Sequence, residues 1–453
     1  MLMYYSRRKK SVYIAIIMIL MFIFSSLNAP SLVYAEDNWP QAPAISAEAA
    51  IVVEADSGAI LYEKNSHDQH YPASITKIMT TLLALENCPL TDTVHFSKDA
   101  VYKVEGTQVG ITPDEDVQLD ECLYGIMLAS GNEIAYAVAE HVGGTLDNFV
   151  DMMNKRATEL GCTNTHFNNP HGLPDENHYT CAYDMALIAR TAYKIENFRT
   201  ISGTKYHIIP PTNIYPEERA FSNHHKMLTN SQYHYDYCTG GKTGYTNAAR
   251  YNLVTFAEKD GMSLICVIMK DDQSQFQYED TTNLFNYCFD NFHKVDIKDT
   301  ELGNNLDSSG LFPLDNNVFP SDNASISFEE NASLIVPNTV DISQLTHNVE
   351  YKDNSDGNTD AYIQYKYDEH LLGDIPVIYQ AVESTEAAVS SSTPVTNNNS
   401  NYIKINVRII LYIVLGIIAV ALIALLVLRF VLNHHFAGPL EFQKKNKRQN
   451  KRK

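Results

Sequence analysis

The chain has 453 residues, of which 34 are Lys or Arg and 54 are Asp or Glu, for a formal net charge of −20. This length allows two or three domains, and a hydrophobic content of 45% is sufficient to build buried cores. An acidic surface repels nucleic acid and anionic lipid headgroups, so neither is an expected partner.

Both ends of the chain carry targeting signals. Residues 7–10 are basic and precede an apolar run at residues 12–24, and small residues suited to cleavage lie just before Glu36. This pattern is typical of a secretory signal peptide, so residues 1–35 are predicted to be removed on export. Residues 409–428 form an uncharged apolar run of 20 residues, long enough to cross a bilayer as a helix. A buried core helix is the alternative, but this run is apolar on every face.

These signals predict where each segment lies. We expect a transmembrane helix at residues 407–430 and a cytoplasmic tail at residues 431–453, because basic residues stay on the cytoplasmic side. Between residues 383 and 402, 12 of 20 residues are Ser, Thr or Asn, so residues 381–406 are predicted to form a flexible linker. The exported part then carries 22 basic and 53 acidic residues, about −31. It is expected on the outer face of the cell membrane, in a single-pass protein.

The cysteine pattern excludes some kinds of site. The seven cysteines are odd in number and show no C-x-x-C spacing, which indicates neither a disulfide framework nor a thiolate zinc site. Most lie within apolar runs and are expected to be small buried side chains, although a single disulfide stays open. They are Cys88, Cys122, Cys162, Cys181, Cys238, Cys266 and Cys288.

The secondary structure can be predicted in chain order. Two runs rich in strand formers around Asp56-Ser57-Gly58 predict a hairpin at residues 50–55 and 60–62. Apolar residues at helical spacing then predict a helix that begins at Ser74, and residues 92–112 show a mixed pattern. A helical stretch after residues 113–116 is predicted to end at Leu128, and further helices are predicted at residues 134–142, 148–160 and 182–193. Further runs predict strands at residues 238–246, 252–257 and 262–269, and a closing helix at residues 276–292 that packs across the sheet.

This order of elements predicts the fold class. Helices in the middle with strands at both ends favour an α+β domain at residues 36–293. Alternating runs at residues 325–328, 333–336 and 362–365 predict a small, sandwich-like all-β domain at residues 294–380.

The sequence Ser74-Ile75-Thr76-Lys77 is unusual for a helix start. Ser74 could simply cap the helix, since serine is a favoured capping residue. However, a helix start prefers Glu or Gln three residues later, and the positive charge of Lys77 opposes the helix dipole. A serine hydroxyl needs a neighbouring base to become a nucleophile, and a lysine in a dry cleft can supply one. The pair is therefore a candidate catalytic site.

Two further motifs follow this one, Ser130-Gly131-Asn132 and Lys242-Thr243-Gly244. Taken singly, Ser130-Gly131-Asn132 could be a helix C-terminus with glycine in its usual place. Lys242-Thr243-Gly244 could likewise be a plain strand end and turn. Taken together, at a helix start, an interhelical turn and a strand of an exported chain, the three motifs match a known signature. It is the S-x-x-K, S-D-N and K-T-G set of penicillin-binding proteins and class A β-lactamases, with Gly131 as the one difference.

On these motifs, residues 36–380 resemble the D-alanyl-D-alanine carboxypeptidases, peptidase family S11, among low-molecular-mass penicillin-binding proteins. Tyr71-Pro72-Ala73-Ser74 and His171-Gly172-Leu173 add to the resemblance. It implies a serine β-lactamase/penicillin-binding-protein-like transpeptidase fold, with an antiparallel sheet flanked by helices and a helical subdomain. It also implies removal of the terminal D-Ala from peptidoglycan stem pentapeptides, in cell-wall biogenesis, with β-lactams as inhibitors and without cofactor or metal.

The resemblance implies a role for each motif residue. Ser74 would attack the substrate carbonyl and form an acyl-enzyme after Lys77 takes its proton. Ser130 would relay a proton to the leaving amine, and Asn132 would bind the substrate amide and the lysine.

The third motif would bind the substrate. Lys242 and Thr243 would bind the terminal carboxylate, and Gly244 would let the substrate backbone approach as an added strand. The backbone N–H groups of Ser74 and Tyr245 would form the oxyanion hole.

Two alternatives to a serine carboxypeptidase remain open. The first is a zinc D,D-peptidase that uses His166, His171, His178 and Asp175, since imidazole and carboxylate groups suit zinc. Against it, these residues form no H-E-x-x-H helix pair. The second rival is a penicillin-binding sensor, in which Ser74 is acylated without turnover. An assay of D-Ala release with EDTA present would distinguish the three, because loss of release with EDTA favours zinc, and acylation by labelled penicillin without D-Ala release favours the sensor.

Overall fold

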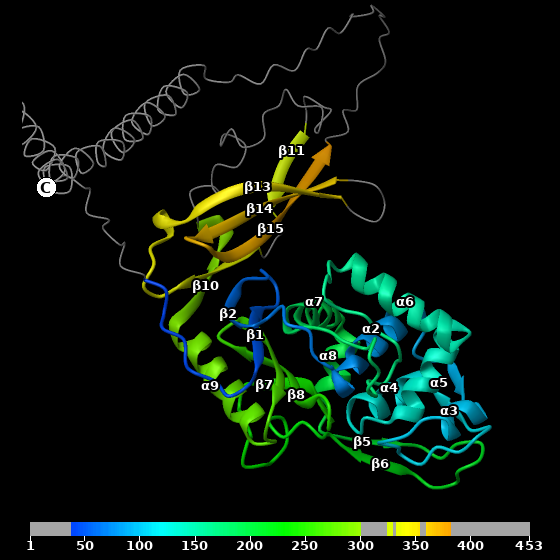
Figure 1. Ribbon diagram of the computed structural model, residues 1–453. Helices are drawn as coiled ribbons and strands as arrows, with labels where there is room; N and C mark the ends of the chain where they lie inside the picture. Colours follow the sequence, from blue (N-terminus) through cyan, green and yellow to red (C-terminus); the bar gives the residue numbers. More distant parts are fainter. Residues whose placement is uncertain (1–37, 300–323, 329–331, 354–358, 382–453) are drawn as a thin grey trace, which may run out of the picture. The chain divides into compact units, whose positions relative to one another are not determined.

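The computed structural model describes residues 38–299, 324–328, 332–353 and 359–381 (Figure 1). The predicted signal peptide, membrane span and cytoplasmic tail lie outside these residues, as does the predicted linker apart from Ala381. Within them, none of the helices combines the length and the hydropathy that crossing a bilayer requires.

A five-stranded antiparallel sheet organises the first part of the chain, and its strands lie in the order β2-β1-β9-β8-β7. The predicted hairpin and the three predicted later strands are confirmed as members of this one sheet. The strands are β1 (Ala49–Glu54), β2 (Ile60–Lys64), β7 (Cys238–Thr246), β8 (Arg250–Lys259) and β9 (Met262–Asp271).

Both faces of this sheet are covered, which explains why its central strands are apolar throughout. On β1, Ile51 and Val53 belong to one buried core, whereas Ala50 and Val52 belong to another on the opposite face. Strand residues alternate between the two faces, so a strand that is buried on both sides has no polar face.

Helices pack on each face of the sheet (Figure 1). Helix α9 (Phe276–Asn291) contacts β8 and β9 on one face, which confirms the predicted closing helix. On the other side, α7 (Ala182–Tyr193) contacts β1 and β9 and matches its predicted bounds.

The chain between β2 and β7 is the predicted helical insertion. Its helices are η1 (Ala73–Thr76), α2 (Lys77–Asn87), α3 (Lys98–Tyr102), α4 (Leu119–Met127), α5 (Asn132–Gly143), α6 (Leu146–Glu159), α7 and α8 (Glu196–Gly203). It also contains two short antiparallel strand pairs that were not predicted, because three or four residues give too few alternations to detect. They pair β3 (Thr93–His95) with β4 (Asp116–Gln118), and β5 (Tyr206–Ile209) with β6 (Arg219–Ser222).

The strands after α9 pair among themselves. Strand β10 (Phe292–Asp296) pairs with β12 (Ser333–Pro337), and a four-stranded antiparallel sheet has the order β11-β15-β14-β13. The strands predicted in this region are confirmed, and a third core that includes Ile297, Leu334 and Ile363 lies between them. The remaining elements are η2 (Ile297–Asp299), β11 (Ala324–Phe328), η4 (Ile342–Gln344), β13 (Thr346–Asp353), β14 (Thr359–Tyr367) and β15 (His370–Ala381).

Candidate active site

Ser74 and Lys77 lie at the junction of two helical segments. Ser74 is in the 3₁₀ turn η1 and is half-buried, and Lys77 is the first residue of α2. The helix therefore begins with a tighter turn than the sequence predicted. Lys77 Nζ donates a hydrogen bond to Ser74 Oγ at 3.1 Å. Neither η1 nor α2 has a side-chain cap, so the interpretation of Ser74 as a capping residue is wrong.

Lys77 is completely buried and surrounded by neutral acceptors. Besides Ser74, its Nζ donates to Asn132 Oδ1 at 2.7 Å and to the His171 carbonyl at 2.8 Å. Within the described part of the chain, no carboxylate forms an ion pair with it. Burial, and next the charge of Lys242, hold the pKa of Lys77 well below its usual value. A neutral amine in contact with a hydroxyl can accept the proton of that hydroxyl.

The second motif brings two more polar side chains to this lysine. Ser130 lies between α4 and α5 with a φ of +65°, and Asn132 is the first residue of α5. The Asn132 amide donates to the Glu105 carbonyl at 2.7 Å, which fixes its oxygen toward Lys77. Ser130 is 6% exposed, and its hydroxyl has no hydrogen-bond partner among the described residues. A buried hydroxyl without a partner is poised to bond a bound molecule.

The third motif passes directly beside the serine on strand β7, at the edge of the five-stranded sheet. A Cβ atom built on Gly244 would lie 3.0 Å from the Ser74 backbone nitrogen, so the two backbones are in contact there. Thr243 is half-buried, and Tyr245 is exposed, with its ring 4.5 Å from that of Tyr251. The absence of a side chain at Gly244 keeps the space beside Ser74 free.

Lys242 is the second buried cation of the site. It is 1% exposed, and its Nζ donates to the Thr243 carbonyl at 3.1 Å. Burial lowers its pKa to about 7. Two lysines that are buried without a carboxylate partner make this region favourable for an anion. The structure thus brings the residues of all three motifs into one site.

Asn252 supports the serine, and it was not predicted. Its side-chain amide donates to the carbonyls of Tyr71 and Pro72, each at 2.8 Å, and its oxygen accepts from the Lys270 backbone at 2.8 Å. These bonds tie the turn before Ser74 to strand β8. A fully buried asparagine in an otherwise apolar central strand was the available signal in the sequence.

The His171-Gly172 segment supports the site from the other side. The φ of Gly172 is +91°, and a Cβ atom there would lie within 1.9 Å of the Ala73 carbonyl oxygen. Ala73 itself has a φ of +51°, which is uncommon for a residue with a side chain. Asn169 fixes this segment, because its side-chain oxygen accepts from the Gly172 backbone at 2.7 Å. The segment thus supports the backbone just before Ser74 and supplies the carbonyl that Lys77 contacts.

The four residues proposed for the zinc rival do not assemble a site. Both ring nitrogens of His178 are engaged, with Thr76 Oγ1 at 2.9 Å and with the Asn168 backbone at 2.9 Å. His166 contacts the Asn177 carbonyl at 2.6 Å instead. Burial lowers the pKa of His171 and of His178 to about 3. Among the described residues, side chains of His, Cys, Asp and Glu come close enough together to hold a metal ion in one group only. That group contains none of these four residues.

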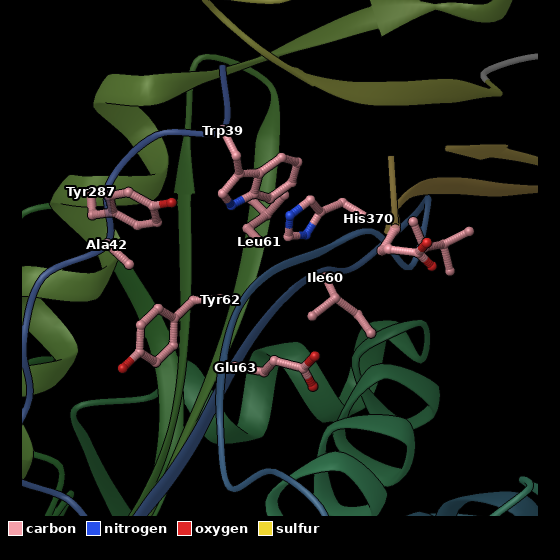
Figure 2. Close-up of a pocket in the computed structure, with 10 residues that line it drawn as sticks. Trp39, Ala42, Ile60, Leu61, Tyr62, Glu63, Tyr287 and His370 are labelled. Carbon is pink, nitrogen blue, oxygen red and sulfur yellow. The ribbon is translucent and has the colours of Figure 1, made fainter. Parts of the chain in front are cut away.

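A pocket of about 230 Å³ lies elsewhere, beside β2 at the opposite edge of the sheet from β7. Figure 2 shows the rings of Trp39 and His370 beside each other, stacked at 3.6 Å, with Tyr287 to their left and Tyr62 below. None of the motif residues lines it, so this pocket is separate from the site at Ser74.

Comparison with known proteins agrees with this geometry. The family model for D-alanyl-D-alanine carboxypeptidase, peptidase S11, matches residues 36–273. The chain is 36% identical over 252 residues to D-alanyl-D-alanine carboxypeptidase DacF of Bacillus subtilis, a match that spans 54% of this chain and 63% of the relative. It is 30% identical over 289 residues to DacC of Escherichia coli, which spans 60% of this chain and 68% of that relative.

Solved structures give the same result. A D-alanyl-D-alanine carboxypeptidase from Mycobacterium tuberculosis matches with a TM-score of 0.52 and 30% identity, over 55% of this chain and 94% of that one. A Streptomyces DD-transpeptidase matches with a TM-score of 0.52 and 29% identity, over 55% of this chain and 100% of that one. The antiparallel sheet with its helices is thus the penicillin-binding-protein-like α+β fold. With a family model that matches more than half of its length, this chain belongs to the D-alanyl-D-alanine carboxypeptidases of peptidase family S11.

Proposed function

We propose that this protein is a serine-type D-Ala-D-Ala carboxypeptidase that removes the terminal D-Ala from peptidoglycan stem pentapeptides. One observation carries the proposal: Lys77 contacts both Ser74 and Asn132, while the Gly244 backbone lies beside the Ser74 nitrogen. A nucleophile, its base and a substrate-binding strand edge therefore meet at one point. The names of the relatives support the same activity.

The reaction begins with acylation. Neutral Lys77 takes the Ser74 proton as the serine oxygen attacks the carbonyl carbon of the penultimate D-Ala. The backbone N–H groups of Ser74 and Tyr245 stabilise the oxyanion. When the peptide bond breaks, the proton held by Lys77 is relayed through the Ser130 hydroxyl to the leaving nitrogen, which leaves Lys77 neutral again, and the terminal D-Ala departs as a free amino acid. Water then hydrolyses the ester and restores the serine.

Binding precedes these steps. The substrate carboxylate pairs with protonated Lys242 and accepts from the Thr243 hydroxyl. The peptide lies along β7 as an added strand, which Gly244 allows, and Asn132 bonds its amide. A β-lactam imitates this peptide end and acylates Ser74, but its ester hydrolyses too slowly for the enzyme to recover.

The test uses the full chain in detergent with a pentapeptide that ends in D-Ala-D-Ala. We expect release of D-Ala with EDTA present, and a penicillin adduct on Ser74 that is lost in Ser74→Ala. Acylation without D-Ala release would support the sensor instead. Loss of release with EDTA, reversed by Zn²⁺, would support the zinc peptidase. An adduct that persists in Ser74→Ala would overturn the assignment of the nucleophile.

We also propose that the catalytic part lies outside the cell and is anchored by a transmembrane helix at residues 407–430, after removal of residues 1–35. The apolar and basic segments of the sequence support this topology. The strands from β10 to β15, with a core of their own, support a separate small β domain that holds the active site away from the membrane. Protease added to intact cells is expected to cleave the exported part and to leave the tail protected. A tail that is cleaved under the same conditions would contradict this orientation.

A further inference from the structure

A second cluster of reactive side chains lies in the helical insertion, away from Ser74. Cys88 follows the last residue of α2, Asp92 precedes β3, and His141 is in the last turn of α5. One ligand atom from each side chain lies within 4.8 Å of the other two. His141 Nε2 lies 3.3 Å from Asp92 Oδ2.

The backbone around this cluster is held by hydrogen bonds. The Cys88 nitrogen donates to the Ala84 carbonyl at 3.1 Å, which continues the pattern of α2. The Asp92 nitrogen donates to the Pro89 carbonyl at 3.0 Å, so the two ligands stand on either side of one tight turn. The Asp92 carbonyl in turn accepts from the Leu119 nitrogen at 2.8 Å. Ligands on such fixed backbone lose little freedom when they bind an ion.

The side chains themselves are accessible yet partly shielded. Cys88 is a half-buried free thiol, and no hydrogen bond to its sulfur occurs among the residues described here. His141 and Asp92 are 23% and 37% exposed in their side chains. An ion could therefore enter from solvent and be held partly out of water.

The donor types select the kind of ion. A thiolate, an imidazole and a carboxylate suit Zn²⁺ and similar transition metals, whereas Mg²⁺ and Ca²⁺ prefer oxygen donors alone. Three protein ligands leave a fourth tetrahedral position for water. This set is unlike the surface group of His95, Asp114 and Asp116, which contains no sulfur and is more exposed.

The position of the cluster connects it to the catalytic residues. Lys77 begins α2 and Asn132 begins α5, and their side chains meet at 2.7 Å. Cys88 and His141 lie at the other ends of the same two helices. With a rise of 1.5 Å per residue, the cluster lies about 16 Å along α2 from Lys77. A bound ion would join the helices at one end while Lys77 and Asn132 join them at the other.

We propose that Cys88, Asp92 and His141 form a binding site for a transition metal ion of the Zn²⁺ type. The ion ties the C-terminal ends of α2 and α5 to the turn before β3. It stabilises the helical insertion and takes no part in the reaction at Ser74. As it binds, the thiol gives up its proton to solvent and the imidazole stays neutral.

The test titrates the full chain in detergent, after treatment with a chelator, with Co²⁺ as a spectroscopic probe for the Zn²⁺ site. We expect one equivalent of Co²⁺ to bind and to give a thiolate-to-cobalt charge-transfer band that Zn²⁺ abolishes. Cys88→Ser should remove the band. Cys88→Ser and His141→Ala should each weaken Zn²⁺ binding by at least about tenfold, since even indirect changes at metal sites cost 10–100-fold. Zn²⁺ should raise the Tm of the parent and leave that of either variant unchanged.

Two control variants match these changes. Cys162→Ser removes another half-buried free cysteine, and His95→Ala removes another histidine beside aspartates. Both should bind Co²⁺ as the parent does. The proposal is overturned if the parent gives no charge-transfer band, if Cys88→Ser retains it, or if Cys162→Ser loses it. Equal Tm values of the metal-free parent and Cys88→Ser would show that the variant still folds. The zinc-peptidase rival predicts instead that D-Ala release depends on Zn²⁺ in Cys88→Ser as well.

Discussion

At the scale of single residues, the site contains two lysines whose pKa values are lowered by burial. For Lys77, the charge of the buried Lys242 lowers the pKa further. The proposed mechanism uses both lysines, because only a neutral Lys77 can take a proton and only a charged Lys242 attracts a carboxylate. In that mechanism Lys77 is the base and Lys242 is the anion-binding group.

The first prediction concerns the base. Lys77→Met should slow acylation by labelled penicillin by about 10²–10⁴-fold, the usual contribution of one general base. The same variant should unfold at a lower temperature than the parent, because it leaves the buried Asn132 oxygen and the His171 carbonyl without their donor. Time courses of labelling and thermal unfolding measure the two effects. Lys103→Met, at an exposed lysine, is the control and should acylate normally. Normal acylation by Lys77→Met would show that another group is the base.

The second prediction concerns pH. The pKa of Lys242 in the free protein is lowered to about 7, so this lysine loses its charge as the pH rises above that value. The KM for a pentapeptide with a free carboxylate should therefore rise between about pH 7 and 9, because the partner of the carboxylate becomes neutral. A substrate that ends in D-Ala-amide should show no such rise. Parallel increases for both substrates would mean that Lys242 does not bind the carboxylate.

At the scale of elements, the position of Ser74 is set by contacts from segments far away in the sequence. Strand β8 supplies Asn252, which holds the carbonyls of Tyr71 and Pro72, and the segment before α7 supplies Gly172, which packs on Ala73. The 3₁₀ turn that contains Ser74 is thus held from two sides. Such support keeps a nucleophile in a productive orientation.

The third prediction tests this support with two glycines. Gly172→Ala should lower both the Tm and the rate of acylation, since its Cβ would lie 1.9 Å from the Ala73 oxygen and displace the turn before Ser74. Gly161 also has a positive φ, of +84°, but nothing lies within 4 Å of a Cβ there. Gly161→Ala should cost about 1–2 kcal/mol of stability for its backbone conformation alone. It should acylate as the parent does. Equal rates in the two variants would mean that the contact with Ala73 is unimportant.

At the scale of the whole molecule, the sequence predicted the class of fold and the order of the main elements. The strands β7 to β9 and the helix α9 follow patterns of six or more residues, which are long enough to recognise, and the β1–β2 hairpin was recognised from its turn at Asp56-Ser57-Gly58. The strand pairs β3–β4 and β5–β6 were missed because their strands have only three or four residues.

The site was predicted where its residues form short linear motifs, and missed where they do not. Ser74 and Lys77 are separated by one helical turn, so their contact could be predicted from spacing. Asn252 was missed, and Gly172 was noted only within the segment that adds to the resemblance, because their contacts span 181 and about 100 positions, respectively. No local pattern reports such contacts, because they depend on how the sheet and the helical insertion fold together. The same holds for Cys88 and His141.

The fourth prediction concerns the extent of the active part. The predicted linker begins at residue 381, so a chain of residues 36–381 lacks the predicted membrane span at residues 407–430. It should therefore be soluble without detergent and should release D-Ala at the rate of the full chain. Sedimentation of membranes and the D-Ala assay measure these properties. A full chain that also stays in solution after the membranes are removed would contradict the predicted anchor.

The contact between Gly244 and the Ser74 backbone limits how this protein could escape an antibiotic. A side chain at position 244 would lie 3.0 Å from both the Ser74 nitrogen and the Pro72 carbonyl oxygen, so it would displace the turn that carries Ser74. A displaced Ser74 would react more slowly with a β-lactam and with a peptide alike. We therefore expect a substitution that lowers β-lactam acylation here to lower D-Ala release as well.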